Sequence, residues 1–218
     1  MNKQWIVVAS VVAVVVAFIA GAVVFKGRET QQVSQAAQSN SDALVRASSP
    51  VFGNPAAKVT IVEFFDPACE TCRAFYPLVK TIVNSSFGQV RLVVRHAPLH
   101  QGSDTAVKIL EAARLQGQYW PAVERALAGQ PQWAAHGNAR PELIWDMITD
   151  IGLDMAKARS DADSPAVAQL LAQDIADMKA LKVDRTPGFF VNGIPLRDFG
   201  EAQLRVLVDQ EIKRVKAP

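Results

Sequence analysis

The sequence has 218 residues, a formal net charge of +2 and 50% hydrophobic residues. A chain of this length forms one domain with appendages, or at most two small domains. The near-neutral charge, with Lys and Arg scattered singly, excludes a general nucleic-acid-binding protein, which carries a basic stripe. Two cysteines, 12 glycines and 12 prolines exclude disulfide-stapled miniproteins and collagen-like or low-complexity chains.

The first expected element is an apolar run from Trp5 to Phe25, which contains no charged residue. At about 1.5 Å per residue it makes a helix of roughly 31 Å, the thickness of a bilayer's hydrocarbon core. The run is longer than the roughly 7–15 apolar residues of a signal peptide. We therefore expect residues 1–26 to form an uncleaved, single-pass transmembrane anchor. The alternative is a signal peptide cleaved after Ala22, and the evenly divided flanking charges do not set the orientation.

The next segment, residues 27–50, is rich in Gln, Ser and Ala and holds few large apolar side chains. Such a composition does not bury enough surface to offset the entropy lost on ordering, which predicts a flexible tether. The globular domain is then expected to occupy residues 51–218.

The domain contains a strand pattern typical of a mixed sheet. Lys58–Phe65 is almost continuously apolar, which predicts a central strand covered on both faces, and Val90–Arg95 predicts a second strand. Gly188–Val191 predicts a third. The dipeptide Asn192-Gly193 is typical of a two-residue hairpin, so Ile194–Arg197 should return antiparallel to it.

Helices are expected wherever apolar residues recur at helical spacing behind a capping residue or proline. The expected ranges are Ala68–Val83, Ser103–Gln118, Pro121–Ala128, Pro141–Ile151, Asp154–Arg159, Pro165–Lys182 and Glu201–Val215. Residues 103–182 thus form a helical insertion between the second and third strands. This order of elements predicts the α/β class.

Cys69 and Cys72 form a C-x-x-C pair directly after the central strand and at the start of a helix. Free backbone N–H groups and the helix dipole favour an anion at the first cysteine, which lowers its pKa and makes it the attacking thiolate. Cys72, one turn further on, is then the resolving thiol that releases a mixed disulfide.

Two other interpretations of the cysteines compete. His96 and His100 complete a C-x2-C-x23-H-x3-H spacing, but the gap is about twice the roughly 12 residues of a zinc finger. A purely structural disulfide would close so short a loop that its entropic contribution is small. Because the chain has no third cysteine, disulfide exchange must involve another molecule.

Glu63 lies inside the central strand, six residues before Cys69. A carboxyl buried there would have a raised pKa and could accept the proton of Cys72, whereas a solvent-facing glutamate would have no such role. Thr186-Pro187 precedes the third strand. Only about 5–6% of X–Pro bonds are cis in folded proteins, so the dipeptide alone predicts a trans bond.

Four stretches taken together resemble the DsbA-like branch of the thioredoxin superfamily, in particular its membrane-tethered, extracytoplasmic members. They are residues 53–72, 95–103, 105–120 and 186–193, and the similarity extends from Val51 to the last residue. The resemblance implies a thioredoxin fold with a helical insertion. It also implies site roles: a nucleophile at Cys69, a resolving thiol at Cys72, a buried acid at Glu63, and a substrate-binding segment at Thr186 and Pro187 with a cis peptide.

The implied function is exchange of disulfides with exported proteins by a thiol–disulfide oxidoreductase, with no cofactor besides the Cys69–Cys72 pair. The catalytic domain would lie on the periplasmic side of the inner (cytoplasmic) membrane, next to a membrane redox partner. The alternative is a thioredoxin-fold module that binds a partner or holds a metal with idle cysteines.

One departure from the family concerns the two residues between the cysteines. Strongly oxidising members have a histidine there, and this chain has Glu70-Thr71. A carboxylate beside Cys69 opposes the thiolate and makes the disulfide less oxidising, which leaves the direction of electron flow open. We assign no catalytic role to His96, His100 or His136.

Overall fold

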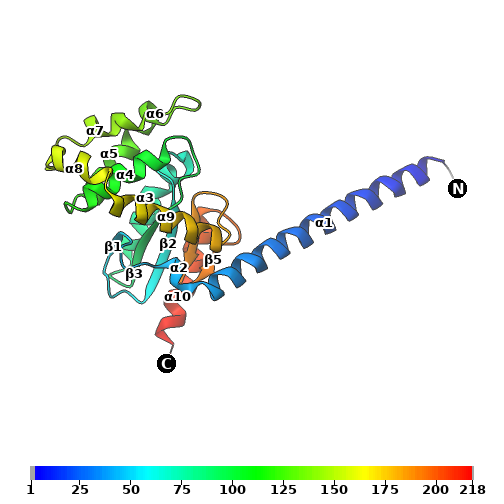
Figure 1. The fold of residues 1–218 in the computed structure, drawn as a ribbon. Helices are drawn as coiled ribbons and strands as arrows, with labels where there is room; N and C mark the ends of the chain where they lie inside the picture. The colour runs from blue at the N-terminus through cyan, green and yellow to red at the C-terminus, as the bar shows by residue number, and fades with distance from the viewer. Residues whose placement is uncertain (1–2, 218) are drawn as a thin grey trace.

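The computed structural model describes residues 3–217. Its centre is a five-stranded sheet of order β1-β3-β2-β4-β5 (Figure 1). The strands are β1 (Val51–Gly53), β2 (Val59–Phe65), β3 (Val90–His96), β4 (Gly188–Val191) and β5 (Ile194–Pro195). β2 runs parallel to β3, and the other neighbouring pairs are antiparallel. The predicted mixed sheet is confirmed.

Both faces of the sheet are covered, as the apolar central strand predicted. Side chains alternate along a strand. Ile61 and Phe65 of β2 therefore pack with α3 (Glu70–Ser85) and α10 (Glu201–Lys216). Val62 and Phe64 pack on the opposite face with residues at the end of α9 (Pro165–Ala180). Every residue of β2 except Thr60 is buried.

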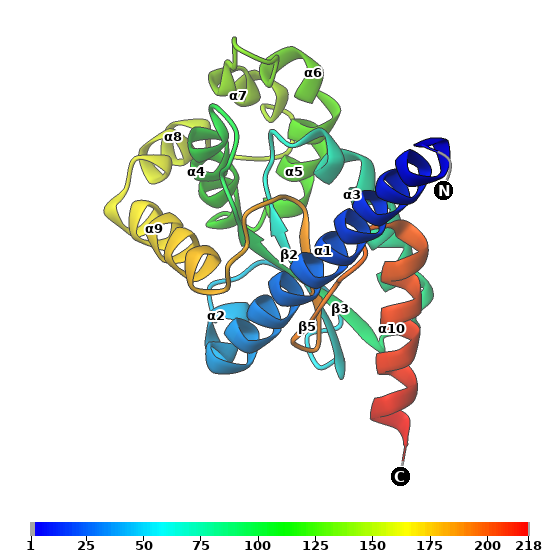
Figure 2. The same cartoon turned by 90° about the vertical axis from the view of Figure 1, so that its right-hand side faces the viewer.

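The helical insertion comprises α4 (Ser103–Arg114), α5 (Tyr119–Ala128), α6 (Gln130–Trp133), a 3-10 turn η1 (Pro141–Leu143), α7 (Ile144–Met147), α8 (Met155–Ala162) and α9. The helices of the insertion from α4 to α8 lie at one end of the sheet (Figure 2) and share a continuous core with it, and the last helix of the insertion, α9, covers a face of the sheet. The helix expected over Pro141–Ile151 is shorter, since it is split into η1 and α7 and ends at Met147.

A local sequence pattern predicted the hairpin between β4 and β5 but gave no sign of the edge strand. Asn192 and Gly193 have φ angles of 47° and 83°, the left-handed conformation that a type I′ turn requires, and β4 pairs with β5 as predicted. The edge strand β1 was not predicted. Its three residues are too few to display a period, and its pairing partners lie about forty residues away, at Arg91–Val93.

The segment predicted to be a flexible tether is helical instead. α1 (Lys3–Ser39) extends through most of it, and α2 (Ser41–Leu44) follows. Ala37, Ala43 and Leu44 are buried against the face of the sheet that also contacts α9. Small side chains let the helix approach closely. Val33, Ala36 and Ala37 follow a helical i, i+3, i+4 spacing, so one stripe buries enough surface to order the segment.

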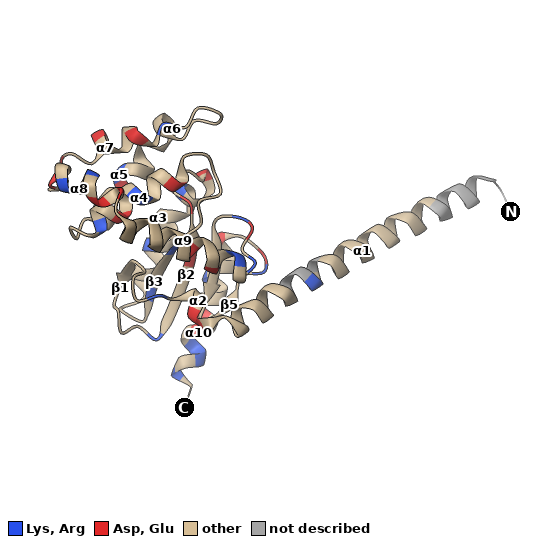
Figure 3. Cartoon of the chain, viewed as in Figure 1, with Lys and Arg blue, Asp and Glu red and all other residues tan. Residues whose placement is uncertain are grey.

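The first part of α1 projects away from the domain (Figure 1). Its large apolar side chains from Val11 to Phe25 are exposed, and in Figure 3 the ribbon over this stretch carries no charged-residue colour. Among the residues that the structure describes, no helix meets the length and hydropathy needed to cross a membrane. The predicted anchor begins at Trp5, and its side chains up to Ser10 lie outside the described residues.

A buried ion network joins the insertion to the sheet. The guanidinium of Arg95, at the end of β3, is inaccessible to solvent and donates to Asp174 Oδ1 at 2.7 and 3.0 Å and to Asp177 Oδ2 at 2.6 Å. His96 Nδ1 lies 2.8 Å from Asp174 Oδ2. Arg46, just after α2, donates from Nε and Nη2 to the two carboxylate oxygens of Asp177. The network ties α9, β3 and the segment before β1 together.

Candidate active site

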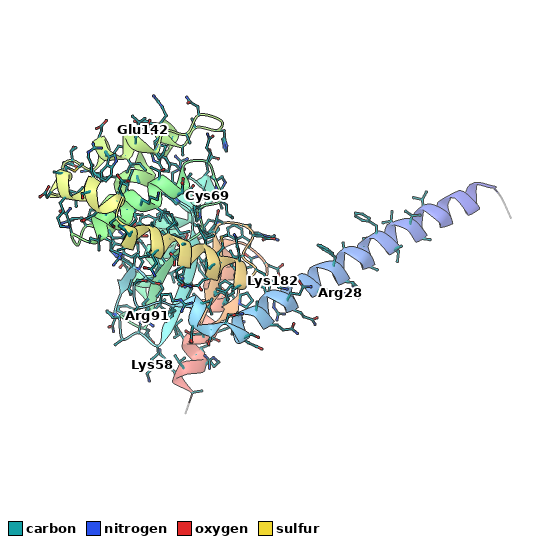
Figure 4. All side chains as sticks on the ribbon, in the orientation of Figure 1. Arg28, Lys58, Cys69, Arg91, Glu142 and Lys182 are labelled. Carbon is teal, nitrogen blue, oxygen red and sulfur yellow. The ribbon has the colours of Figure 1, made fainter. Side chains whose placement is uncertain are left out.

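The C-x-x-C pair lies at the junction of β2 and α3, as the sequence predicted. Cys69 is the N-cap residue of α3, with extended backbone angles, and Cys72 lies in its first turn. Both cysteines are free thiols, and both side chains are buried, with Cys72 completely inaccessible. In Figure 4, Cys69 lies between Glu142 of the insertion and Lys182, which precedes β4.

The turn before the cysteines is organised by Asp66. Its carboxylate accepts hydrogen bonds from the backbone N–H of Ala68 at 2.9 Å and from those of Leu99 and His100 at 2.8 and 2.9 Å. Ser103 Oγ and His100 Nδ1 also bind it. The backbone N–H of Asp66 itself lies 3.5 Å from Cys72 Sγ. The sequence reasoning missed this carboxylate as an organiser of the site.

The loop before β4 meets the cysteines from the other side. The Thr186–Pro187 peptide bond is cis, as the family resemblance implied. Cys69 Sγ lies 3.4 Å from the carbonyl oxygen of Thr186, to which the thiol donates. The Thr186 hydroxyl is buried and makes no hydrogen bond of ordinary geometry within the described part of the chain, yet it lowers the pKa of Cys69, as a donor to the thiolate would. Residues 117 positions apart thus form one site.

The two thiols have opposite acidities. Hydrogen bonding by Cys72, followed by that of Thr186 and of the backbone N–H groups of Cys72 and Thr71, lowers the pKa of Cys69 to about 5 against the opposing effect of burial. Burial, followed by the interaction with Cys69 and the charge of Glu63, raises the pKa of Cys72 well above its ordinary value. At neutral pH the pair therefore holds a thiolate at Cys69 and a proton on Cys72.

Glu63 lies beneath this pair. It lies on the same face of β2 as Ile61 and Phe65, two residues from each, so it faces the side of the sheet that α3 covers. The side chain is 1% exposed, and its Oε1 has no hydrogen-bond partner among the described residues. Burial, and secondly the negative charge of Cys69, raises the pKa of Glu63 to about 8. The solvent-facing alternative for this residue is therefore wrong.

Two further contacts come from the insertion. The buried side chain of Gln130 donates from Nε2 to the carbonyl oxygens of Pro67 and Cys69 at 2.8 and 3.0 Å. The exposed imidazole of His136 lies 3.7 Å from the Glu70 carboxylate. Neither residue belongs to a local motif, and each lies more than sixty positions from its partner in the chain. Sequence patterns carry no signal for such contacts.

The contacts of the two histidines concern the alternative interpretation of the cysteines as a zinc site. His96 and His100, whose spacing suggested it, bind Asp174 and Asp66 respectively. Within the described residues, no three side chains of the His, Cys, Asp or Glu type are grouped as metal ligands would be.

Comparisons with known proteins agree with this geometry. Residues 46–210 match the family described as thioredoxin. A thioredoxin-like oxidoreductase from Silicibacter pomeroyi is 33% identical, with a TM-score of 0.69 over 82% of this chain and 99% of that one. The thiol-disulfide exchange protein alpha-DsbA2 from Wolbachia pipientis shares the fold at 22% identity, with a TM-score of 0.69 over 84% of this chain and 97% of that one.

A third relative has an unexpected name. The Na(+)/H(+) antiporter NhaA of Herminiimonas arsenicoxydans is 33% identical over 72% of this chain, yet the match covers only 24% of the antiporter. This chain thus spans about a quarter of the length of that relative. The family match covers most of the chain, including both cysteines and the cis-proline loop. The chain therefore belongs to the thioredoxin family, with the fold of DsbA-like disulfide oxidoreductases.

Proposed function

We propose that this chain is a thiol–disulfide oxidoreductase that exchanges disulfides with protein substrates through Cys69 and Cys72. The observation that carries the proposal is the difference in acidity between the two thiols. The pKa of Cys69 is lowered to about 5, and that of the neighbouring Cys72 is raised. Only the thiolate is nucleophilic, so at neutral pH one sulfur attacks while the other stays protonated until it is needed.

The exchange proceeds in two displacements. The Cys69 thiolate attacks a substrate disulfide, so that a bond forms between Cys69 and one substrate sulfur and the other leaves as a thiolate. Cys72 then gives up its proton and attacks Cys69, which releases the second substrate thiolate and leaves the Cys69–Cys72 disulfide. The reverse sequence oxidises a dithiol substrate. Atoms and electrons balance in both directions.

Glu63 is the proposed acceptor of the Cys72 proton. With a pKa of about 8 the carboxyl is partly ionised near neutrality, and the ionised fraction grows once the mixed disulfide removes the Cys69 charge that raises this pKa; within the described residues its Oε1 has no other partner. Thr186 and Pro187 are proposed to bind the backbone of the substrate, because the Thr186 carbonyl lies within 3.4 Å of the attacking sulfur.

The substitution Cys69→Ser tests the function. Exchange with a model dithiol or with glutathione disulfide should be abolished, because no other thiolate is available to attack. The matched variant Cys72→Ser should still attack but accumulate the mixed disulfide, which mass spectrometry would detect. Unchanged exchange in the Cys69→Ser protein would contradict the assignment.

We propose further that the domain acts outside the cytoplasm, tethered by residues 1–26 to the cytoplasmic membrane, on exported proteins and with a membrane redox partner. The uncharged run Trp5–Phe25 supports this placement. Fractionation of cells, with protease added outside the cytoplasmic membrane, tests it. Recovery of the intact chain in the soluble cytoplasm would refute it.

A further inference from the structure

The inference concerns the carboxylate of Asp66, which is completely buried. All five of its hydrogen-bond partners are donors: three backbone N–H groups, the Ser103 hydroxyl and the imidazole of His100. Only donors therefore surround the negative charge of this carboxylate. This charge lies at the end of β2, three residues before Cys69. A buried charge is costly unless an opposite charge compensates it.

His100 is the partner that can supply that opposite charge. Its Nδ1 lies 2.7 Å from Asp66 Oδ2, whereas the backbone groups and the hydroxyl of Ser103 carry no charge. The His100 side chain is 42% exposed, so its other ring nitrogen can exchange protons with water. The pair is neutral when His100 is protonated, and it carries one negative charge when His100 is not.

We propose that His100, held by Asp66, is a positioning residue whose positive charge stabilises the Cys69 thiolate. The inference rests on the proposed function and deepens it. The acidic groups that act on His100 are Asp66, whose carboxylate it contacts and whose backbone N–H lies 3.5 Å from Cys72 Sγ, and, through their charges, Cys69 and Glu70 at the start of α3. Since all three are acidic, each favours the protonated imidazole, and linkage makes the effect reciprocal.

The electrostatics agree with this role. Burial lowers the pKa of His100, but the hydrogen bond and charge of Asp66, followed by the charges of Cys69 and Glu70, raise it above its ordinary value. As pH rises through that pKa, the Asp66 charge loses its compensation and the thiolate becomes less stable. A less stable thiolate makes the disulfide less oxidising. The oxidising power of the site should therefore decline as His100 loses its proton.

Reciprocity gives a test on the unmodified full chain. The pKa of each histidine is measured by NMR with the cysteines oxidised and then reduced. The pKa of His100 should be higher in the reduced protein by about half a unit, because only that form carries the Cys69 thiolate. His96, which binds Asp174 and not the cysteines, is the internal control and should titrate alike in both forms. Equal His100 pKa values in the two forms would overturn the inference.

Two variants separate charge from structure. His100→Gln should raise the pKa of Cys69 by the same half unit or so, and His100→Lys, which keeps the charge, should not. His136→Gln removes an exposed imidazole that contacts Glu70, and it should leave the Cys69 pKa unchanged. An equal rise in the Gln and Lys variants at position 100 would show a purely structural role and overturn the inference. Failure of the proposed function would appear differently, as an unreactive Cys69 in the unmodified protein.

Discussion

Two regions of this domain contain buried acidic groups, and the pKa values of those groups are shifted in opposite directions. At the end of β3, Arg95 is bound by Asp174 and Asp177, and His96 adds a further contact to Asp174. Burial works against both carboxylates, yet hydrogen bonds from His96, Arg46 and Arg95 lower the pKa values of Asp174 and Asp177. Beneath α3, Glu63 has an unpartnered oxygen, and its pKa is raised.

The difference distinguishes a structural use of buried polarity from a chemical one. A fully satisfied network is fixed, because removing any partner leaves a buried charge uncompensated. A group without a partner is destabilising, but it stays available to take a proton or to bind a reacting atom. Glu63 Oε1 and Thr186 Oγ1 are of this second kind, and both residues shift the pKa values of the cysteines; at the other region Glu111 Oε1, 3.5 Å from His96 Nε2, also lacks a hydrogen-bond partner among the described residues. The predictions below test whether the two regions differ in this way.

The largest expected effect is on stability. Arg95→Leu leaves Asp174 and Asp177 buried without their shared cation, which should lower the free energy of unfolding by about 3–5 kcal/mol. Urea denaturation of the full chain measures this. The folded fraction should keep its thiol exchange, because the network does not touch the cysteines. A loss below about 1 kcal/mol would show that the network contributes little.

The second prediction concerns rate at the other region. Glu63→Gln keeps the shape of the side chain but cannot accept a proton, so resolution of the mixed disulfide by Cys72 should slow by about 100-fold. The first attack by Cys69 should be nearly unaffected. Rapid-quench measurement of the two steps separates them. Equal slowing of both steps would argue for a general disturbance of the site rather than a proton-transfer role.

The third prediction is an opposite pH dependence of the two regions. The folded protein holds Glu63 protonated up to about pH 8, whereas the unfolded chain ionises it near 4.5. Between these values this one group should lower stability by about 1.4 kcal/mol per pH unit as pH rises. Asp174 and Asp177 have lowered pKa values, so their contribution is lost as pH falls. Because the lowered pKa of Cys69 gives a slope of opposite sign over much of this range, the Glu63 contribution is the difference between the stability curves of the unmodified protein and of Glu63→Gln, and both should keep the loss of stability at acid pH.

The smallest expected effect comes from the residue after Cys69. The Glu70 carboxylate is largely exposed, so solvent screens its effect on the thiolate. Glu70→Gln should make the disulfide more oxidising by only about 20 mV. Equilibration with glutathione buffers measures the change. A shift toward a more reducing potential would contradict the predicted sign.

Local patterns predicted the elements that carry the chemistry. The strand, the C-x-x-C pair, the helix start and the Asn192-Gly193 turn are each encoded within about ten residues, and the structure shows all of them. The cis bond at Pro187 came from the family resemblance, because the dipeptide alone predicts trans. The structure contains the predicted elements that had a strong apolar period or a strong turn signal. Some helices begin or end at other residues than predicted.

Contacts between distant segments could not be predicted in the same way. Gln130 binds the Cys69 carbonyl from the insertion, and His100 binds Asp66 from the loop after the neighbouring strand β3. The part of α1 after Phe25 is helical where small residues pack against the sheet. The sequence does not show this burial, because it does not show the sheet surface that these residues contact. His96 and His100 were given no role because a polar residue at a strand end carries no pattern of its own.

The most direct test of the account is the acidity of the two thiols in the reduced full chain. Alkylation at a series of pH values, followed by mass spectrometry of the peptides, reports each cysteine separately. We predict that Cys69 is labelled with a pKa of about 5 and that Cys72 resists labelling throughout the neutral range. Two cysteines labelled at similar rates, each with an ordinary thiol pKa, would contradict the assignment of Cys69 as the nucleophile.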